Sequence, residues 1–131
     1  MSIWTHVTGI IRVDGRPAEE NYEKIKEIMG VTCKYRDNDE IRKACTAPKG
    51  REDSIQYYIH EYATGFPWAI IAIWGDLRDY DNLKEIKEWV NGIYDAFDDY
   101  DGILFIRQGI VTCYVDNGSK IEQITIPYHC D

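Results

Sequence analysis

The most apolar stretch of the chain lies at residues 68–77, and its apolar side chains occupy both alternating sets of positions. One set consists of Ala69, Ile71, Ile73 and Leu77, and the other consists of Trp68, Ile70, Ala72 and Trp74. Successive side chains of a β-strand point to opposite faces of its sheet. The pattern therefore predicts a central strand over residues 68–78 that needs cover on both of its faces.

Several other segments have the alternation or the extended apolar character of strands. They cover residues 3–13, 54–62, 102–115 and 121–126, with a short additional strand at 31–35. Gly109 marks a point where the longest of them is expected to bulge or bend. Residues 63–67 form a turn of hairpin length, so the strands on either side should pair antiparallel, and residues 116–119 predict a second hairpin.

Two segments carry apolar residues at the spacing of an amphipathic helix. The first covers residues 17–29 and is expected to end at Gly30. The second begins near Asn82, which is followed three residues later by a glutamate in the spacing of a capping box, and it ends within residues 98–102. A brief helix is also expected between residues 38 and 45.

The order of these elements is strand, helix, strand, strand, helix, strand, followed by one extra strand. This order resembles the ferredoxin-like superfold, an α+β architecture (βαββαβ) whose antiparallel sheet carries both helices on one face. The chain of 131 residues is long enough for one domain with a hydrophobic core, which we expect to span residues 1–131, with an added C-terminal hairpin strand. The superfold hosts enzymes, ligand sensors and interaction modules, so the resemblance does not select a function.

Helices that cover one face of the sheet leave the other set of strand positions uncovered. The side chains at those positions include more apolar and aromatic groups than a monomer normally exposes. We expect this open sheet face to bind a ligand or a partner through Trp4, His6, Arg12, Tyr58, His60, Tyr62 and Trp74. Three covers are considered, namely residues 31–53, the C-terminal tail and a second copy of the chain, and the expected assembly is a homodimer through this face.

Acidic residues are concentrated in one part of the chain. The net charge is −8, and residues 76–101 carry nine acidic against three basic residues, whereas residues 1–60 carry ten of each. Such a field repels phosphate backbones, so we do not expect direct binding of nucleic acid. The four acids near the expected end of the second helix are Asp95, Asp98, Asp99 and Asp101. They oppose the helix dipole, and two interpretations stay open: a solvated helix end, or a docking surface for a basic protein partner.

No set of residues in the sequence has the spacing of a common catalytic, metal or nucleotide motif. The four cysteines include no C-x-x-C pair, which argues against a zinc site and favours reduced thiols. His6 and His60 are both expected on the open sheet face, where they either face one another for acid–base work or serve as packed polar groups. His129 and Cys130 form a candidate ligand pair in the tail. We expect neither a metal nor a cofactor.

Two classes of function fit this sequence. The first is a non-enzymatic interaction or ligand-binding protein, such as a small acidic inhibitor (of the mobile-element or phage type) of a larger intracellular protein, or a protein that sequesters a small ligand. The second is a small ferredoxin-like enzyme with a pocket on the open sheet face that uses His6, His60 and Tyr58. The lack of a convergent catalytic set favours the first class. No apolar run reaches the roughly 18 residues of a membrane span, and no signal-peptide pattern is present, so we expect a cytoplasmic protein with no membrane partner.

Overall fold

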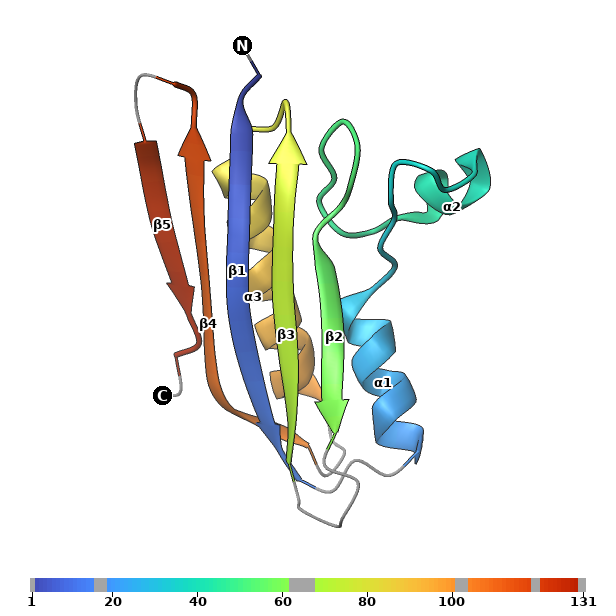
Figure 1. The fold of residues 1–131 in the computed structure, drawn as a ribbon. Coiled ribbons are helices and arrows are strands. Elements are labelled where there is room, and N and C mark those ends of the chain that lie inside the picture. Colours follow the sequence, from blue (N-terminus) through green and yellow to red (C-terminus); the bar gives the residue numbers. More distant parts are fainter. Residues whose placement is uncertain (1, 16–18, 62–67, 101–103, 119–120, 130–131) are drawn as a thin grey trace.

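A computed structural model describes residues 2–15, 19–61, 68–100, 104–118 and 121–129 (Figure 1). Its strands are β1 (Trp4–Asp14), β2 (Gln56–Glu61), β3 (Trp68–Arg78), β4 (Phe105–Asp116) and β5 (Ile121–Pro127). Its helices are α1 (Glu19–Met29), α2 (Asp39–Ala44) and α3 (Leu83–Asp99). The mixed α+β class that the sequence predicts is therefore confirmed.

The five strands form one antiparallel sheet in the order β2-β3-β1-β4-β5. β1 is the middle strand, and it pairs along its whole length with β3 on one side and with β4 on the other. The doubly apolar strand β3 lies between β1 and β2, so it is an interior strand, although β1 takes the central place. β4 and β5 form the C-terminal hairpin.

α1 and α3 lie on the same face of the sheet (Figure 1), and the hydrophobic core fills the space between the two layers. The strands contribute side chains of one parity to this core, for example Ile11 and Ile71, which are fully buried. The helices contribute the apolar stripes predicted from their spacing, for example Met29 from α1 and Phe97 from α3. Burial of each such side chain stabilises the fold by roughly 1.5–3 kcal/mol.

Residues 31–35 form no strand, which corrects the prediction made for them. Their backbone groups bond to irregular chain and to side chains instead of to a neighbouring strand. The Val31 carbonyl accepts a hydrogen bond from the Thr46 amide at 2.9 Å, and the Cys33 amide donates to the Ser54 hydroxyl at 2.9 Å. These contacts satisfy the backbone without a ladder.

The irregularity in β4 lies before Gly109, which corrects its predicted position. The pairing of β1 with β4 shifts between Arg12 and Val13, where Arg107 is the extra residue of β4. Gly109 has a different role: a β-carbon at this position would come within 2.9 Å of the Tyr94 ring. The glycine thus allows α3 and β4 to approach closely.

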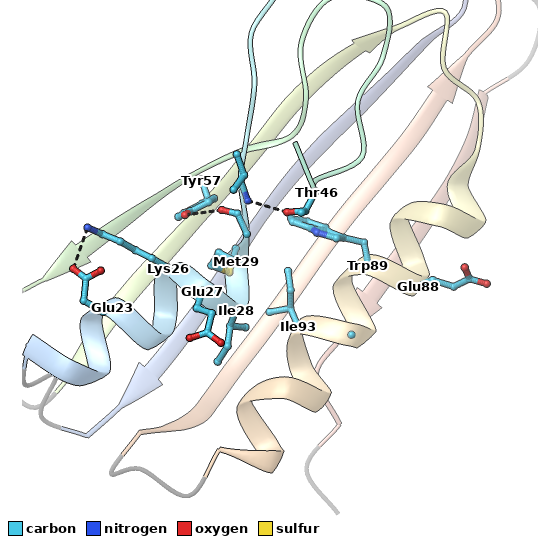
Figure 2. A pocket seen from close by; sticks show the side chains of 13 residues that line it. Glu23, Lys26, Glu27, Ile28, Met29, Thr46, Tyr57, Glu88, Trp89 and Ile93 are labelled. Atoms are coloured by element: carbon cyan, nitrogen blue, oxygen red, sulfur yellow. Dashed lines mark hydrogen bonds and ion pairs between the residues drawn. The ribbon is translucent and has the colours of Figure 1, made fainter. Parts of the chain in front are cut away.

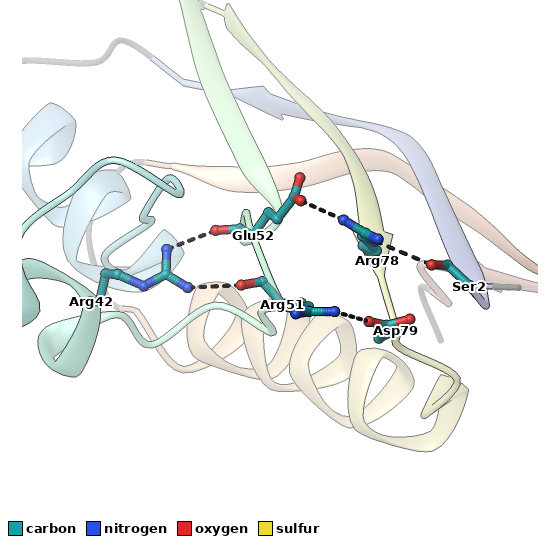
Figure 3. Close-up of polar contacts among 6 residues, drawn as sticks. All are labelled: Ser2, Arg42, Arg51, Glu52, Arg78 and Asp79. Carbon is teal, nitrogen blue, oxygen red and sulfur yellow. Dashed lines mark hydrogen bonds and ion pairs between the residues drawn. The ribbon is translucent and has the colours of Figure 1, made fainter.

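Arginine side chains fasten the segment between α1 and β2 to one end of the sheet (Figure 3). The Arg42 guanidinium donates to the carbonyls of Lys34 and Glu52, at 2.7 Å each. Arg78 of β3 in turn pairs with the Glu52 carboxylate at 2.9 Å. These charged side chains therefore hold irregular backbone in place.

Candidate functional site

The sheet face opposite α1 and α3, which we call the open face, holds most of the exposed apolar surface of the described residues. Ten large hydrophobic side chains are exposed among these residues, and seven of them lie on the open face. The seven are Ile10, Tyr58, Trp74, Phe105, Ile110, Tyr114 and Ile121. The sheet thus has one apolar face in the core and a second, mixed face whose apolar side chains are in contact with solvent.

One row of cross-strand neighbours crosses the centre of the open face on all five strands. Its members are, in order, Tyr58, Ala72, Ile10, Ile110 and Pro127. Adjacent strands lie about 4.8 Å apart, so the row is an apolar band on the order of 20 Å long. Directly opposed side chains on one face interact with each other, which gives the band a continuous surface.

Neither of the two chain segments considered as covers lies over this face in the described residues. Tyr58 and Trp74, on the two strands nearest to residues 31–53, remain 57% and 47% exposed. The tail turns toward the helix layer, where the Tyr128 ring packs against Tyr94 with 5.4 Å between ring centroids. The described parts of these two segments therefore leave the open face uncovered.

A histidine–carboxylate pair marks one end of the open face. His6 and Asp76 are direct neighbours across β1 and β3, and His6 Nδ1 lies 2.5 Å from Asp76 Oδ1. The His6 ring also lies between aromatic groups, 4.7 Å from the Tyr114 ring and stacked at 6.4 Å on Trp4. The carboxylate therefore fixes the orientation of the imidazole within an aromatic cluster.

Two arginines mark the other end of the open face. Asp14 accepts from Arg12 Nε at 3.0 Å and from Arg107 Nε at 3.2 Å, so one carboxylate serves two guanidinium groups. The Arg12 guanidinium also lies 5.2 Å above the Trp68 ring, in cation–π geometry. This end of the face carries an excess of positive charge.

His60 does not face His6, which corrects that part of the enzyme hypothesis. His60 pairs with Ile70 of β3, whereas His6 pairs with Asp76, six residues further along the same strand. Six residues of a strand span about 20 Å, so the two imidazoles cannot act on one substrate atom. His60 packs edge-on against Tyr58 at 4.5 Å. Tyr62, the remaining residue predicted for this face, lies outside the described residues.

The acidic end of α3 belongs to the opposite layer of the molecule. Asp95, Asp98 and Asp99 are exposed on this helix, and Asp98 accepts a hydrogen bond from the Tyr128 hydroxyl at 2.7 Å. Asp101 lies outside the described residues. The open face and the acidic cluster are therefore two separate surfaces.

An open groove between α1 and α3 on the helix layer, of about 860 Å³, was not foreseen from the sequence (Figure 2). Its apolar lining includes Met29, Trp89 and Ile93. The polar atoms beside it are engaged in structural bonds, since the Tyr57 hydroxyl donates to the carbonyl of residue 30 at 3.1 Å. The groove forms only where two helices distant in sequence come together, and its single sequence signal is Gly92, a glycine in the middle of a helix.

The thiols of the described cysteines are free and lie away from the open face. Burial raises the pKa of the Cys33 thiol, which also lies beside the thiol of Cys45. Burial raises the pKa of the Cys113 thiol to about 11. Both shifts disfavour the nucleophilic thiolate. No group of three or more His, Cys, Asp or Glu side chains among the described residues is arranged to hold a metal ion.

Comparison of the chain with protein-family models, with curated proteins and with solved structures finds no match. Within the described residues, no helix has the length and apolar character needed to cross a membrane. The open face therefore has to be interpreted from its own chemistry.

Proposed function

We propose that the protein is a non-enzymatic interaction module that associates with a second copy of itself through the open face. The observation that carries this proposal is the concentration of seven of the ten exposed large hydrophobic side chains of the described residues on that one face. Monomers rarely leave a contiguous apolar patch of more than a few hundred Å² in water. Stacking two such faces removes both patches from water, which favours association.

The size of the open face supports this proposal. β1 has 11 residues, which corresponds to about 36 Å along the strand, and the sheet is on the order of 20 Å across. The face therefore offers on the order of 700 Å² per copy, close to the roughly 800 Å² that each partner contributes to a standard interface. The face is therefore large enough for an interface of standard size.

We also propose that the architecture is ferredoxin-like with one added strand. The order β2-β3-β1-β4 within the sheet supports this assignment, as do the helices that follow β1 and β3 on one face. β5 extends that arrangement at the β4 edge. This architecture does not choose between an enzyme and an interaction module, so the function rests on the open face alone.

Two other interpretations, an enzyme with a pocket on the open face and an acidic docking surface on α3, gain no support of their own. An enzyme with a pocket on the open face needs the two histidines to converge, and they lie about 20 Å apart along the sheet. Exposure to water alone accounts for the carboxylates on the surface of α3, so they carry no part of the proposal. Inhibition of a larger protein remains compatible with the same face, because an apolar sheet surface serves either role.

A pair of matched variants tests the proposal. Ile110→Asp places a charge at the centre of the open face, and Ile41→Asp places the same charge on α2; the two side chains are 45% and 41% exposed. Light scattering on both variants and on the wild type measures their masses in solution. We expect Ile110→Asp to be monomeric and Ile41→Asp to dimerise like the wild type. Equal masses for the two variants would contradict the proposal.

A further inference from the structure

Charge on the open face is polarised along the strands. At one end lie Asp76, which is 72% exposed, and Asp116, whose carboxylate accepts a hydrogen bond from the Gly118 amide at 2.9 Å. Arg78 also lies at this end, but the Glu52 carboxylate at 2.9 Å balances its charge. At the other end lie the guanidinium groups of Arg12 and Arg107, which share a single carboxylate and are 42% and 67% exposed. The central apolar row separates the two ends.

This polarity distinguishes the ways in which two open faces can stack. A two-fold axis that relates two stacked sheets must lie in the plane between them. An axis parallel to the strands places each basic end on the basic end of the partner, which brings like charges together. An axis across the strands places each basic end on the partner's acidic end, which is electrostatically complementary.

We infer that two copies of the chain stack open face to open face about a two-fold axis that runs across the strands. This inference rests on the proposed self-association and adds its orientation. In this arrangement β1 lies antiparallel over β1 of the second copy. The row of His6 and Asp76 then lies over the row of Arg12, and the end of β4 with Asp116 lies over the end with Arg107.

Two kinds of contact hold such a dimer together. The central row, with Ile10 and Ile110, lies next to the axis and meets the neighbouring row of the other copy, with Thr8 and Trp74, which supplies the burial of apolar surface. Asp76 lies one strand spacing, about 4.8 Å, to the side of Arg12 of the other copy, which the long arginine side chain can span, and Asp116 lies over the part of β4 that carries Arg107 of the other copy. Each pair occurs twice by symmetry. These charges lie away from the axis, so they mainly determine the orientation of the two copies and contribute less to affinity. They disfavour the dimer whose two-fold axis is parallel to the strands, because that dimer brings like charges together.

Charge reversal in two separate chains tests the orientation. Asp76→Arg alone and Arg12→Glu alone each create two like-charge pairs in a dimer, so the Kd of each variant should rise about tenfold or more. In a mixture of the two variants, a heterodimer sets the introduced arginine of one chain against the introduced glutamate of the other. The same heterodimer keeps the native pair of aspartate and arginine at the second site. Native mass spectrometry of an equimolar mixture, with one chain carrying a mass tag, measures the heterodimer directly.

We expect the heterodimer to dominate over both homodimers and to approach the wild-type Kd within about threefold. Asp95→Arg on α3 changes the net charge by the same amount as Asp76→Arg and should leave the wild-type Kd unchanged. If the wild type dimerises but the mixture forms no excess of heterodimer, the orientation is wrong while the proposed function stands. If the wild type is a monomer, both are wrong.

The second pair of variants, Asp116→Arg with Arg107→Glu, provides the same test at the other contact. Circular dichroism shows whether Asp76→Arg and Arg12→Glu are folded, and the second pair decides the outcome if either is unfolded. The second pair should fold, because its substituted residues are exposed and lie toward the two ends of β4. If this pair forms heterodimers preferentially, the result supports a two-fold axis that runs across the strands. If the wild type dimerises and this pair forms no excess of heterodimer, that orientation is wrong.

Discussion

Ile10 of β1 and Ile110 of β4 are direct cross-strand neighbours at the centre of the open face, and each is about half exposed. The residue that follows Ile10 in sequence, Ile11, points to the other face and is fully buried. One strand thus presents isoleucine both to the core and to solvent. Substitutions at the exposed positions should affect self-association, whereas a substitution at the buried position should affect the stability of the fold.

Replacing Ile10 and Ile110 together by threonine should abolish self-association and leave the monomer stable. Threonine keeps the β-branch that suits a strand, and surface substitutions change the unfolding free energy by about 0.5 kcal/mol or less. Ile11→Ala should instead lower the unfolding free energy by about 2–5 kcal/mol. Urea denaturation at a protein concentration below the dimer Kd measures both. A large loss in the threonine variant would mean that these side chains belong to the fold.

Replacing either of two glycines by alanine should change the unfolding free energy, with opposite signs at the two positions. Nothing lies within 4 Å of a β-carbon added at Gly92 in α3, so Gly92→Ala should raise the unfolding free energy by about 0.5–1 kcal/mol through helix propensity. A β-carbon at Gly9 in β1 would lie 2.7 Å from the Val111 side chain and 2.9 Å from the Ile110 carbonyl. Gly9→Ala should therefore destabilise the sheet. Thermal unfolding of the two variants gives the comparison, and a shift in the same direction for both would contradict it.

Alkaline pH should reveal the buried thiol of Cys113. Burial raises its pKa from 9.0 to about 11, so between these values the unfolded chain has lost a proton that the folded chain retains. The stability linked to this group is complete below pH 9.0 and is lost as the pH rises toward 11. Its slope is at most about 1.4 kcal/mol per pH unit.

Cys113→Ala removes this titration, so denaturation curves of the wild type and the variant should converge as the pH rises through that window. Tyrosines whose pKa burial raises, such as Tyr94 with a pKa of about 12, are common to both proteins and cancel in the difference. A stability difference that stays constant with pH would argue against the raised pKa of the thiol.

Arg42→Lys should loosen the segment between α1 and β2. Arg42 Nη1 donates to the carbonyls of Lys34 and Glu52, and Nη2 donates to the carbonyl of Arg51 at 3.4 Å. A lysine ammonium is a single nitrogen, so it cannot supply both arms of this fork. We expect the unfolding free energy to fall by about 1–2 kcal/mol and limited proteolysis within residues 31–55 to accelerate. The control is Arg36→Lys, an exposed arginine of the same segment, which should show neither effect.

The two helices, the parity of the strands and the apolar open face were predictable, because periodicity reports directly which side chains face the core. The strand at residues 68–78 is the clearest example, since its two apolar parities correspond to the core and to the open face. Trp74 and Tyr58 were placed on the open face for the same reason, and both are exposed there.

The features that depend on register were not predictable. The pairing of His6 with Asp76 follows from the alignment of β1 with β3, and no local pattern specifies that alignment. The extra residue at Arg107 changes which side chains of β4 reach the open face, so Phe105 and its neighbours were missed. Residues 31–55 have no periodicity, because side chain to backbone bonds such as those of Arg42 determine their path.

Sedimentation equilibrium of the wild-type protein across a wide range of concentrations tests the central claim most directly. If the open face binds a second copy, the mass should rise with concentration from the 15.3 kDa of one chain toward twice that value and stop there. A mass that stays at 15.3 kDa up to high micromolar concentration would contradict the account.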